Sequence, residues 1–119
     1  MKKDKFKEQL PTIDFVRGSV ITISGRSYYV DPRDTYNALL EQIEEFKSSP
    51  KKIELVIDLE MFNTPSAKKL LEVLKSLESE NAKVVWMYEE DDEDMLQAGQ
   101  DYESMVRLPF EFISKKVGD

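Results

Sequence analysis

Residues 55–74 read LVIDLEMFNTPSAKKLLEVL, and this stretch decides the fold. Its first half continues a nearly unbroken apolar run that starts at Ile53, which is typical of a strand buried on both faces at the centre of a sheet. At Asn63–Ser66 the pattern changes at once to apolar residues at helical spacing. A buried strand that leads directly into an amphipathic helix indicates an α/β fold, in which helices pack on a sheet.

The helix after this strand is predicted over residues 65–79. Proline is favoured at the first helical position because the N–H that it lacks would have no partner there. If Pro65 takes that position, Thr64 is the N-cap and its hydroxyl accepts a backbone N–H, a contact worth about 1 kcal/mol. The apolar stripe of this helix has Val73 at its edge and consists of Ala67, Leu70, Leu71, Leu74 and Leu77.

Two strands and a helix precede the central strand. Residues 13–16 and 20–25 are rich in β-branched side chains and are close enough in sequence to pair as a hairpin. Gly25 is expected to end the second strand. A helix is predicted within residues 31–50, with Asp34 available to cap it. Its positions at helical spacing are Tyr36, Leu39, Leu40, Ile43 and Phe46.

The C-terminal part adds two strands and one helix. The run AKVVWMY at 82–88 is a strand, and PFEFI at 109–113 is a short edge strand, because Pro109 cannot donate to a ladder. The predicted order is therefore ββαβαβαβ, and the fold class is α/β with a mixed sheet of four or five strands. The helix between these strands faces inward with Met95, Leu96 and Tyr102, and Met105 and Val106 are further candidates.

The composition restricts the classes of function. A chain of 119 residues fits one domain, and its net charge of -7 repels nucleic acid and anionic membranes, so neither is expected as a partner. The chain has no Cys and no His, which excludes thiolate nucleophiles, imidazole or thiolate zinc sites and His-based triads. No apolar run is long enough to span a bilayer and no signal peptide is visible, so we expect a cytoplasmic protein.

Six carboxylates stand in a row in residues 89–94. An EF-hand loop with Gly99 at its sixth position would put Leu96 at the third, where an oxygen ligand is needed, so that pattern fails. A magnesium site made of two or three of these carboxylates is one alternative, and a helix start that suits acidic side chains is another. A third alternative is an acidic docking surface for a basic partner, made of Glu89, Glu90, Asp91, Asp92, Glu93 and Asp94.

Asp58 and Glu60 lie near the C-terminal end of the central strand, where α/β folds place ligand sites. Alternation along the strand puts both on one face. They fit an acid–base pair in a carboxylate- or magnesium-dependent enzyme, and they fit equally well as polar residues that contact a partner or solvent. No Gly-rich phosphate loop is present in the sequence. We therefore assign no catalytic residue, no metal site and no cofactor.

The junction between central strand and helix supports a second role for its hydroxyls. A helix N-terminus favours an anion, and a phosphate on Thr64 would bring about -1.5 to -2 charges there. Lys68 lies one turn further on and Lys69 stands beside it, so that a lysine head group could reach the phosphate. Ser66 is the competing acceptor.

Four blocks of the sequence resemble one known family. They are PTIDF at 11–15, GRSYYVDP at 25–32, FNTPSAKKLLEVLKSLE at 62–78 and YEEDDEDMLQAGQDYESMVRLPFEFI at 88–113. Together they resemble the SiaC-type bacterial regulatory phosphoproteins, which are similar in fold to the STAS domains of anti-sigma-factor antagonists. The resemblance implies a single STAS-like regulatory domain at 11–113, between a flexible basic tail at 1–10 and a loose C-terminus at 114–119.

The resemblance also implies a function. The family's phosphoacceptor is the Thr of an Asn-Thr-Ser-Ser pattern, which is Thr64 here, with Pro65 at the third position and Ser66 as the alternative acceptor. The implied system is a non-enzymatic partner switch with a protein kinase, a PP2C-like phosphatase and a target such as a diguanylate cyclase. A constitutive adaptor without phosphorylation is the alternative. The expected partner-binding surface consists of Phe62, Asn63, Thr64, Ser66, Lys68 and Lys69.

Overall fold

The computed structural model describes residues 9–16, 20–29, 31–46 and 52–116, in which five strands and three helices follow one another in the predicted order ββαβαβαβ. The elements are β1 (Thr12–Val16), β2 (Val20–Ser27), α1 (Arg33–Phe46), β3 (Ile53–Phe62), α2 (Thr64–Ser76), β4 (Ala82–Glu89), α3 (Glu93–Met105) and β5 (Phe110–Lys115).

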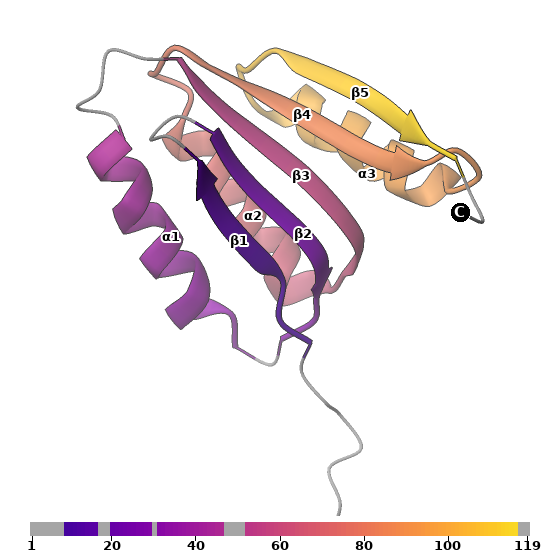
Figure 1. The fold of residues 1–119 in the computed structure, drawn as a ribbon, viewed down its shortest axis with the longest axis horizontal. Coiled ribbons are helices and arrows are strands. Elements are labelled where there is room, and N and C mark those ends of the chain that lie inside the picture. The colour runs from indigo at the N-terminus through magenta and orange to yellow at the C-terminus, as the bar shows by residue number, and fades with distance from the viewer. Residues whose placement is uncertain (1–8, 17–19, 30, 47–51, 117–119) are drawn as a thin grey trace, which may run out of the picture.

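The strands form one mixed sheet in the order β1-β2-β3-β4-β5 (Figure 1). The pair β1–β2 is antiparallel, and the other three pairs are parallel. Parallel neighbours need a crossover connection, and α1, α2 and α3 each supply one. The predicted α/β class with a mixed sheet of up to five strands is therefore confirmed, and β3 lies at the centre as expected.

All three helices lie on the same face of the sheet (Figure 1), because each right-handed crossover moves the chain one strand further in the same direction. Burial along β3 follows this arrangement. Alternate residues from Ile53 to Leu59 are buried against the helices, whereas Val56 and Asp58 are only half-buried and Glu60 is exposed. The prediction that β3 is buried on both faces is therefore wrong, since the described elements cover only one.

The hydrophobic core lies between the sheet and the helices. Trp86 of β4 is its largest fully buried side chain, and its Nε1 donates to the Met95 carbonyl of α3 over 2.9 Å. Tyr36, Leu39 and Ile43 of α1 are buried as predicted. In α2, Val73 is fully buried rather than at the edge of the stripe.

Several element ends differ from the prediction. The strand β2 continues through Gly25, whose φ of 93° is favourable only for glycine, and its register shifts between Gly25 and Arg26 as in a β-bulge. Asp34 lies within the first turn of α1 instead of capping it. The strand β5 runs two residues beyond the predicted end at 113.

The two predicted tails lie largely outside the described residues. Of residues 1–10, the structure describes only the last two, and Gln9 forms an isolated antiparallel bridge with Tyr28. Of residues 114–119, the first two belong to β5 and 117–119 lie outside the described residues.

Candidate functional site

The start of α2 lies one residue earlier than predicted. Asn63 is the N-cap, with an extended backbone (φ -99°, ψ 178°), and its Oδ1 accepts a hydrogen bond from the Ser66 N–H over 3.4 Å. Thr64 and Pro65 are therefore the first and second helical residues. The prediction that Thr64 is the N-cap is wrong, and the helix does not need the Thr64 hydroxyl for its own start.

The Asn63 side chain also fixes the position of this helix start. Its Nδ2 donates to the Tyr29 carbonyl over 2.8 Å, and its Oδ1 accepts from the Tyr29 N–H over 3.3 Å. The Asn63 backbone N–H donates to the Ser27 carbonyl over 3.1 Å. One amide side chain thus joins the end of β3 to the segment after β2, and this contact holds the first turn of α2 against the sheet.

A chain of buried hydroxyls lies beneath the same turn. Ser66 is fully buried, and its Oγ donates to the Ser27 carbonyl over 2.9 Å. The Ser27 Oγ donates in turn to the Ser66 Oγ over 2.8 Å, which leaves the Tyr36 hydroxyl as the donor to Ser27 Oγ, also over 2.8 Å. Burial raises the pKa of Tyr36 to about 12. Of the two candidate acceptors, Ser66 is thus committed to an internal network.

Thr64 is exposed and lies on the rim of an apolar groove between α2 and α3. The groove has a volume of about 290 Å³. Within the described part of the chain, the Thr64 hydroxyl makes no hydrogen bond. Lys68 and Asp101 supply charged atoms at the groove, and the rest of its lining comes from Phe62, Ala67, Leu71, Ala98, Tyr102 and Met105.

Packed aromatic rings support this groove from below. The ring of Phe62 lies 6.3 Å from those of both Trp86 and Tyr102, and the latter two are 5.7 Å apart between centroids. The Tyr102 hydroxyl donates to the Ala67 carbonyl in the first turn of α2 over 2.8 Å. Burial also raises the pKa of Tyr102, so that this hydroxyl keeps its proton. These contacts fix the spacing between α2 and α3.

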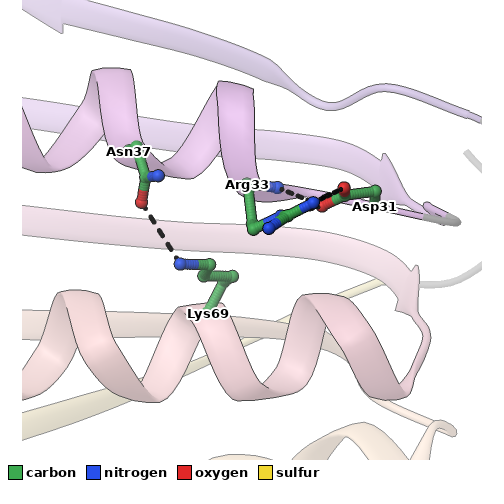
Figure 2. Close-up of polar contacts among 4 residues, drawn as sticks. All are labelled: Asp31, Arg33, Asn37 and Lys69. Atoms are coloured by element: carbon green, nitrogen blue, oxygen red, sulfur yellow. Dashed lines mark hydrogen bonds and ion pairs between the residues drawn. The ribbon is translucent and has the colours of Figure 1, made fainter.

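The two lysines of α2 point to different neighbours. Lys68 is exposed and lines the groove. Lys69 is directed at α1, where its Nζ donates to Asn37 Oδ1 over 3.2 Å, as Figure 2 shows, and it pairs with Glu72 at 3.2 Å. The Lys69 side chain is only 15% exposed. Of the two, Lys68 alone is placed beside Thr64 at the groove.

A tight ion pair lies next to the Lys69 contact (Figure 2). Arg33 Nη2 is 2.7 Å from Asp31 Oδ2, and the hydrogen bond from Arg33 lowers the pKa of Asp31 to about 2. Both side chains are exposed, so this pair orders the start of α1 more than it stabilises the fold.

The acidic run at 89–94 is divided among a strand end, a turn and a helix start. Asp92 is the N-cap of α3, with Oδ1 accepting the Met95 N–H over 3.0 Å, and Glu93 and Asp94 belong to the first turn of the helix. The other three acidic residues are exposed. Among the described residues, no group of three or more acidic side chains is arranged to hold a metal ion.

Asp58 and Glu60 lie on the sheet face that carries no helix, as alternation predicts. Each has a cation as its partner: Lys115 Nζ donates to Asp58, and Arg26 Nε lies 3.0 Å from Glu60 Oε1. The two carboxylates are thus engaged in separate ion pairs across the sheet.

Half of the partner-binding residues predicted from the sequence line the groove. Of the six predicted partner-binding residues, the structure brings Phe62, Thr64 and Lys68 to it, whereas Asn63 and Ser66 support the helix start and Lys69 contacts α1. The contribution of α3 was missed. Its signal was the spacing of Ala98, Asp101, Tyr102 and Met105 at helical intervals, because such residues share one face.

Comparison with known proteins places the chain in a family. A crystal structure of the diguanylate cyclase SiaD in complex with its activator SiaC from Pseudomonas aeruginosa matches with a TM-score of 0.83 and 19% identity, over 92% of this chain and 96% of that one. The structure of apo-SiaC from Pseudomonas aeruginosa matches with a TM-score of 0.79 and 19% identity, over 93% and 96%. These likenesses show the fold and agree with the predicted STAS-like architecture.

Two sequence comparisons and a search for membrane-spanning helices complete these findings. No curated protein sequence matches the chain. Among the described residues, none of the helices has the length and apolar character needed to cross a membrane. The family model described as SiaC family regulatory phosphoprotein matches residues 4–115. The chain therefore belongs to the SiaC family of regulatory phosphoproteins.

Proposed function

We propose that this chain is a cytoplasmic, non-enzymatic partner switch controlled by reversible phosphorylation of Thr64. The observation that carries the proposal is the contrast between the two hydroxyls of the α2 start: Thr64 is exposed on the rim of an apolar groove, whereas Ser66 is buried in a hydrogen-bond network. Its partners would be a protein kinase, a PP2C-like phosphatase and a target. We take the target class, a diguanylate cyclase of cyclic-di-GMP signalling, from the related SiaD–SiaC complex.

Without phosphate, the groove suits the apolar face of a partner. Leu71, Ala98 and Met105 offer methyl and thioether groups, and Met105 is exposed in the free chain. Removing such surface from water on binding is favourable. Lys68 and Asp101 at the groove can orient the incoming segment through its charges.

A phosphate on Thr64 would change this surface without unfolding the helix. Because Thr64 is the first residue of α2, the phosphate would stand where the helix dipole favours an anion. Lys68 lies four residues further along the same face and can pair with it. The doubly charged group and its bound water would then occupy the rim of an apolar groove, so that a partner's apolar face would dock only at a desolvation cost.

Mapping the modified residue tests the first half of the proposal. The native chain would be incubated with ATP and a candidate protein kinase from the same genome, and the product mapped by mass spectrometry. We expect one phosphate on Thr64 and an unmodified Ser66. The variant Thr64→Val should take up no phosphate, and Ser66→Ala should be modified as the native chain is. Modification elsewhere, or none, would contradict the proposal.

Binding of a charge-mimicking variant tests the second half. Thr64→Glu adds an acid where the helix dipole favours it, so the fold should be preserved. We expect its affinity for a candidate diguanylate cyclase from the same genome to fall about tenfold or more, measured by calorimetry. Ser79→Glu adds the same charge at an exposed position outside the groove and should bind as the native chain does. Unchanged binding by Thr64→Glu would instead support a constitutive adaptor.

A further inference from the structure

The outer edge of β5 offers a row of unused backbone groups. Figure 1 shows β5 at one edge of the sheet, and no other described strand pairs with its far side. The carbonyls of Pro109 and Lys115 accept from Val84 and Glu90 on the β4 side. In a parallel strand the N–H and C=O of alternate residues point to the same neighbour, so those of Phe112 and Ser114 point outward.

The side chains of β5 alternate between the two faces of the sheet. Phe110 and Phe112 pack against the core below the helices. Glu111, Ile113 and Lys115 lie on the opposite face, which the described helices leave open. Ile113 is 36% exposed, which makes it one of the few large apolar side chains that the fold leaves partly in water.

This sequence is complementary to itself in one antiparallel register. When two copies of β5 run antiparallel around a two-fold axis at Ile113, each Glu111 stands opposite Lys115 of the other copy and the two Ile113 side chains meet. In that register the outward backbone groups of Phe112 lie opposite those of Ser114 in the other copy. The two residues can therefore exchange two backbone N–H···O=C hydrogen bonds. Opposite charges and apolar pairs directly across strands stabilise a sheet.

The charges around this edge extend the match. Glu111 lies 3.0 Å from Lys83 within the chain, and Lys115 pairs with Asp58. In the paired register the four charges would alternate in sign across the junction, in the order Lys83, Glu111, Lys115 of the second copy and Asp58 of the second copy. Hydrogen bonding with Glu111 already raises the pKa of Lys83. The junction would thus join two ion pairs into a network on each side of the axis.

We propose that the occupant of the β5 edge is a second copy of this chain, which joins two five-stranded sheets into one continuous sheet. The antiparallel two-fold arrangement uses the free β5 edge of both copies at once, so the assembly closes at two copies. Six residues of strand span about 20 Å, which places the interface in the small class below about 1,200 Å². The association is therefore weak and concentration-dependent.

Charge reversal tests the register. Glu111→Lys and Lys115→Glu each place like charges opposite one another twice in a homodimer, and each variant alone should self-associate about tenfold more weakly than the native chain in sedimentation equilibrium. Mixed together, the two variants regain both opposite-charge pairs. Native mass spectrometry should then show a dimer that contains one copy of each variant.

Two charge-matched controls and one backbone variant complete the test. Glu103→Lys and Lys52→Glu change the net charge by the same amounts at exposed positions outside β5, and they should dimerise as the native chain does. Ser114→Pro removes an outward N–H that the chain's own sheet does not use, so it should weaken the dimer while circular dichroism stays native.

Three results would overturn the proposal: a native chain that stays monomeric up to millimolar concentration, a dimer that none of the β5 variants weakens, and a mixture of the two reversals that fails to pair. A fourth result would also overturn it: an extended peptide that binds the β5 edge without competing with self-association of the native chain, which would assign this edge to another partner. None of these results depends on phosphorylation of Thr64, so the switch and the edge can fail separately.

Discussion

Gly99 sets how closely α3 approaches the sheet. A Cβ at this position would lie 2.6 Å from Cδ1 and Nε1 of Trp86 and 2.8 Å from Cε2 of Phe112. Both rings belong to the buried side of β4 and β5, and the Trp86 Nε1 is held by its hydrogen bond to the Met95 carbonyl. The indole therefore cannot move away without losing that bond, and only glycine allows this packing.

The variant Gly99→Ala should accordingly lose stability. Alanine gains up to about 1 kcal/mol in helix propensity, but forcing a methyl group into a packed core costs about 1–3 kcal/mol. We expect a net loss of about 1–2 kcal/mol in the free energy of unfolding, measured by urea denaturation. Gln100→Ala, at the exposed neighbouring position, brings a small gain in helix propensity without any core contact and should not destabilise the chain. A stabilised Gly99→Ala would show that α3 can move away from the sheet.

Tyr36 gives the stability a measurable pH dependence. Its pKa is raised to about 12 by burial, from an ordinary value of 10.0. The folded chain therefore holds this proton more tightly than the unfolded chain does. The stabilisation is complete below pH 10 and is lost as the pH rises towards 12.

The variant Tyr36→Phe removes this contribution to the pH dependence. When the pH is raised from about 9 to about 11, the unfolding free energy of the variant should fall by about 1 kcal/mol less than that of the native chain. At neutral pH it should be less stable, since Ser27 loses a hydrogen-bond donor. Ile43→Val lowers stability in the same core without removing a titrating group, so its pH profile should parallel the native one. Parallel profiles for Tyr36→Phe would contradict the assignment.

At the scale of elements, the N-cap residues of α2 and α3 make different numbers of hydrogen bonds. Asp92 caps α3 through one backbone N–H, whereas Asn63 caps α2 and also makes two hydrogen bonds to the backbone of Tyr29. Asp92→Ala should cost about 1 kcal/mol in unfolding free energy. Asn63→Ala should cost about 2–3 kcal/mol, because it also removes two hydrogen bonds to the Tyr29 backbone. Equal losses in urea denaturation would show that the contact with Tyr29 contributes little.

The same helix start shows where sequence reasoning ends. The change of period at Asn63–Ser66 predicted the strand, the helix and the junction, because these depend on local spacing. It assigned the cap to Thr64, although the true cap is chosen by a contact with Tyr29, 34 residues away. The burial of Ser66 depends on Ser27, which is 39 residues away. Long-range partners of this kind leave no local pattern.

At the scale of the whole molecule, the sequence predicted the order and class of the elements but not the layering. The near-continuous apolar run of β3 indicated burial on both faces, yet all three crossovers place their helices on one side. The open face is instead covered by long charged side chains, such as those of Lys115 and Lys83, which pair across strands. The groove between α2 and α3 likewise arises from packing, since it needs residues of both helices and of β3.

The layering separates the two proposed surfaces. The groove lies between α2 and α3 on the helical side of the sheet, whereas the β5 edge exposes backbone groups in the plane of the sheet and pairs its charges on the open face. A charge added at Thr64 should therefore leave self-association unchanged, because no described residue of the groove belongs to β5. Conversely, Glu111→Lys should leave binding of the cyclase unchanged within about twofold, which corresponds to about 0.4 kcal/mol.

Measuring both affinities on Thr64→Glu, Glu111→Lys and the double variant tests this independence. Mutations at distant sites without shared partners add in free energy, so the double variant should show the sum of the two single effects in each assay. If Thr64→Glu also weakened the dimer, the two sites would be coupled through α3, which packs on β5 and forms one wall of the groove. Phosphorylation would then control assembly as well as partner choice, and the dimer rather than the single chain would be the unit that the kinase switches.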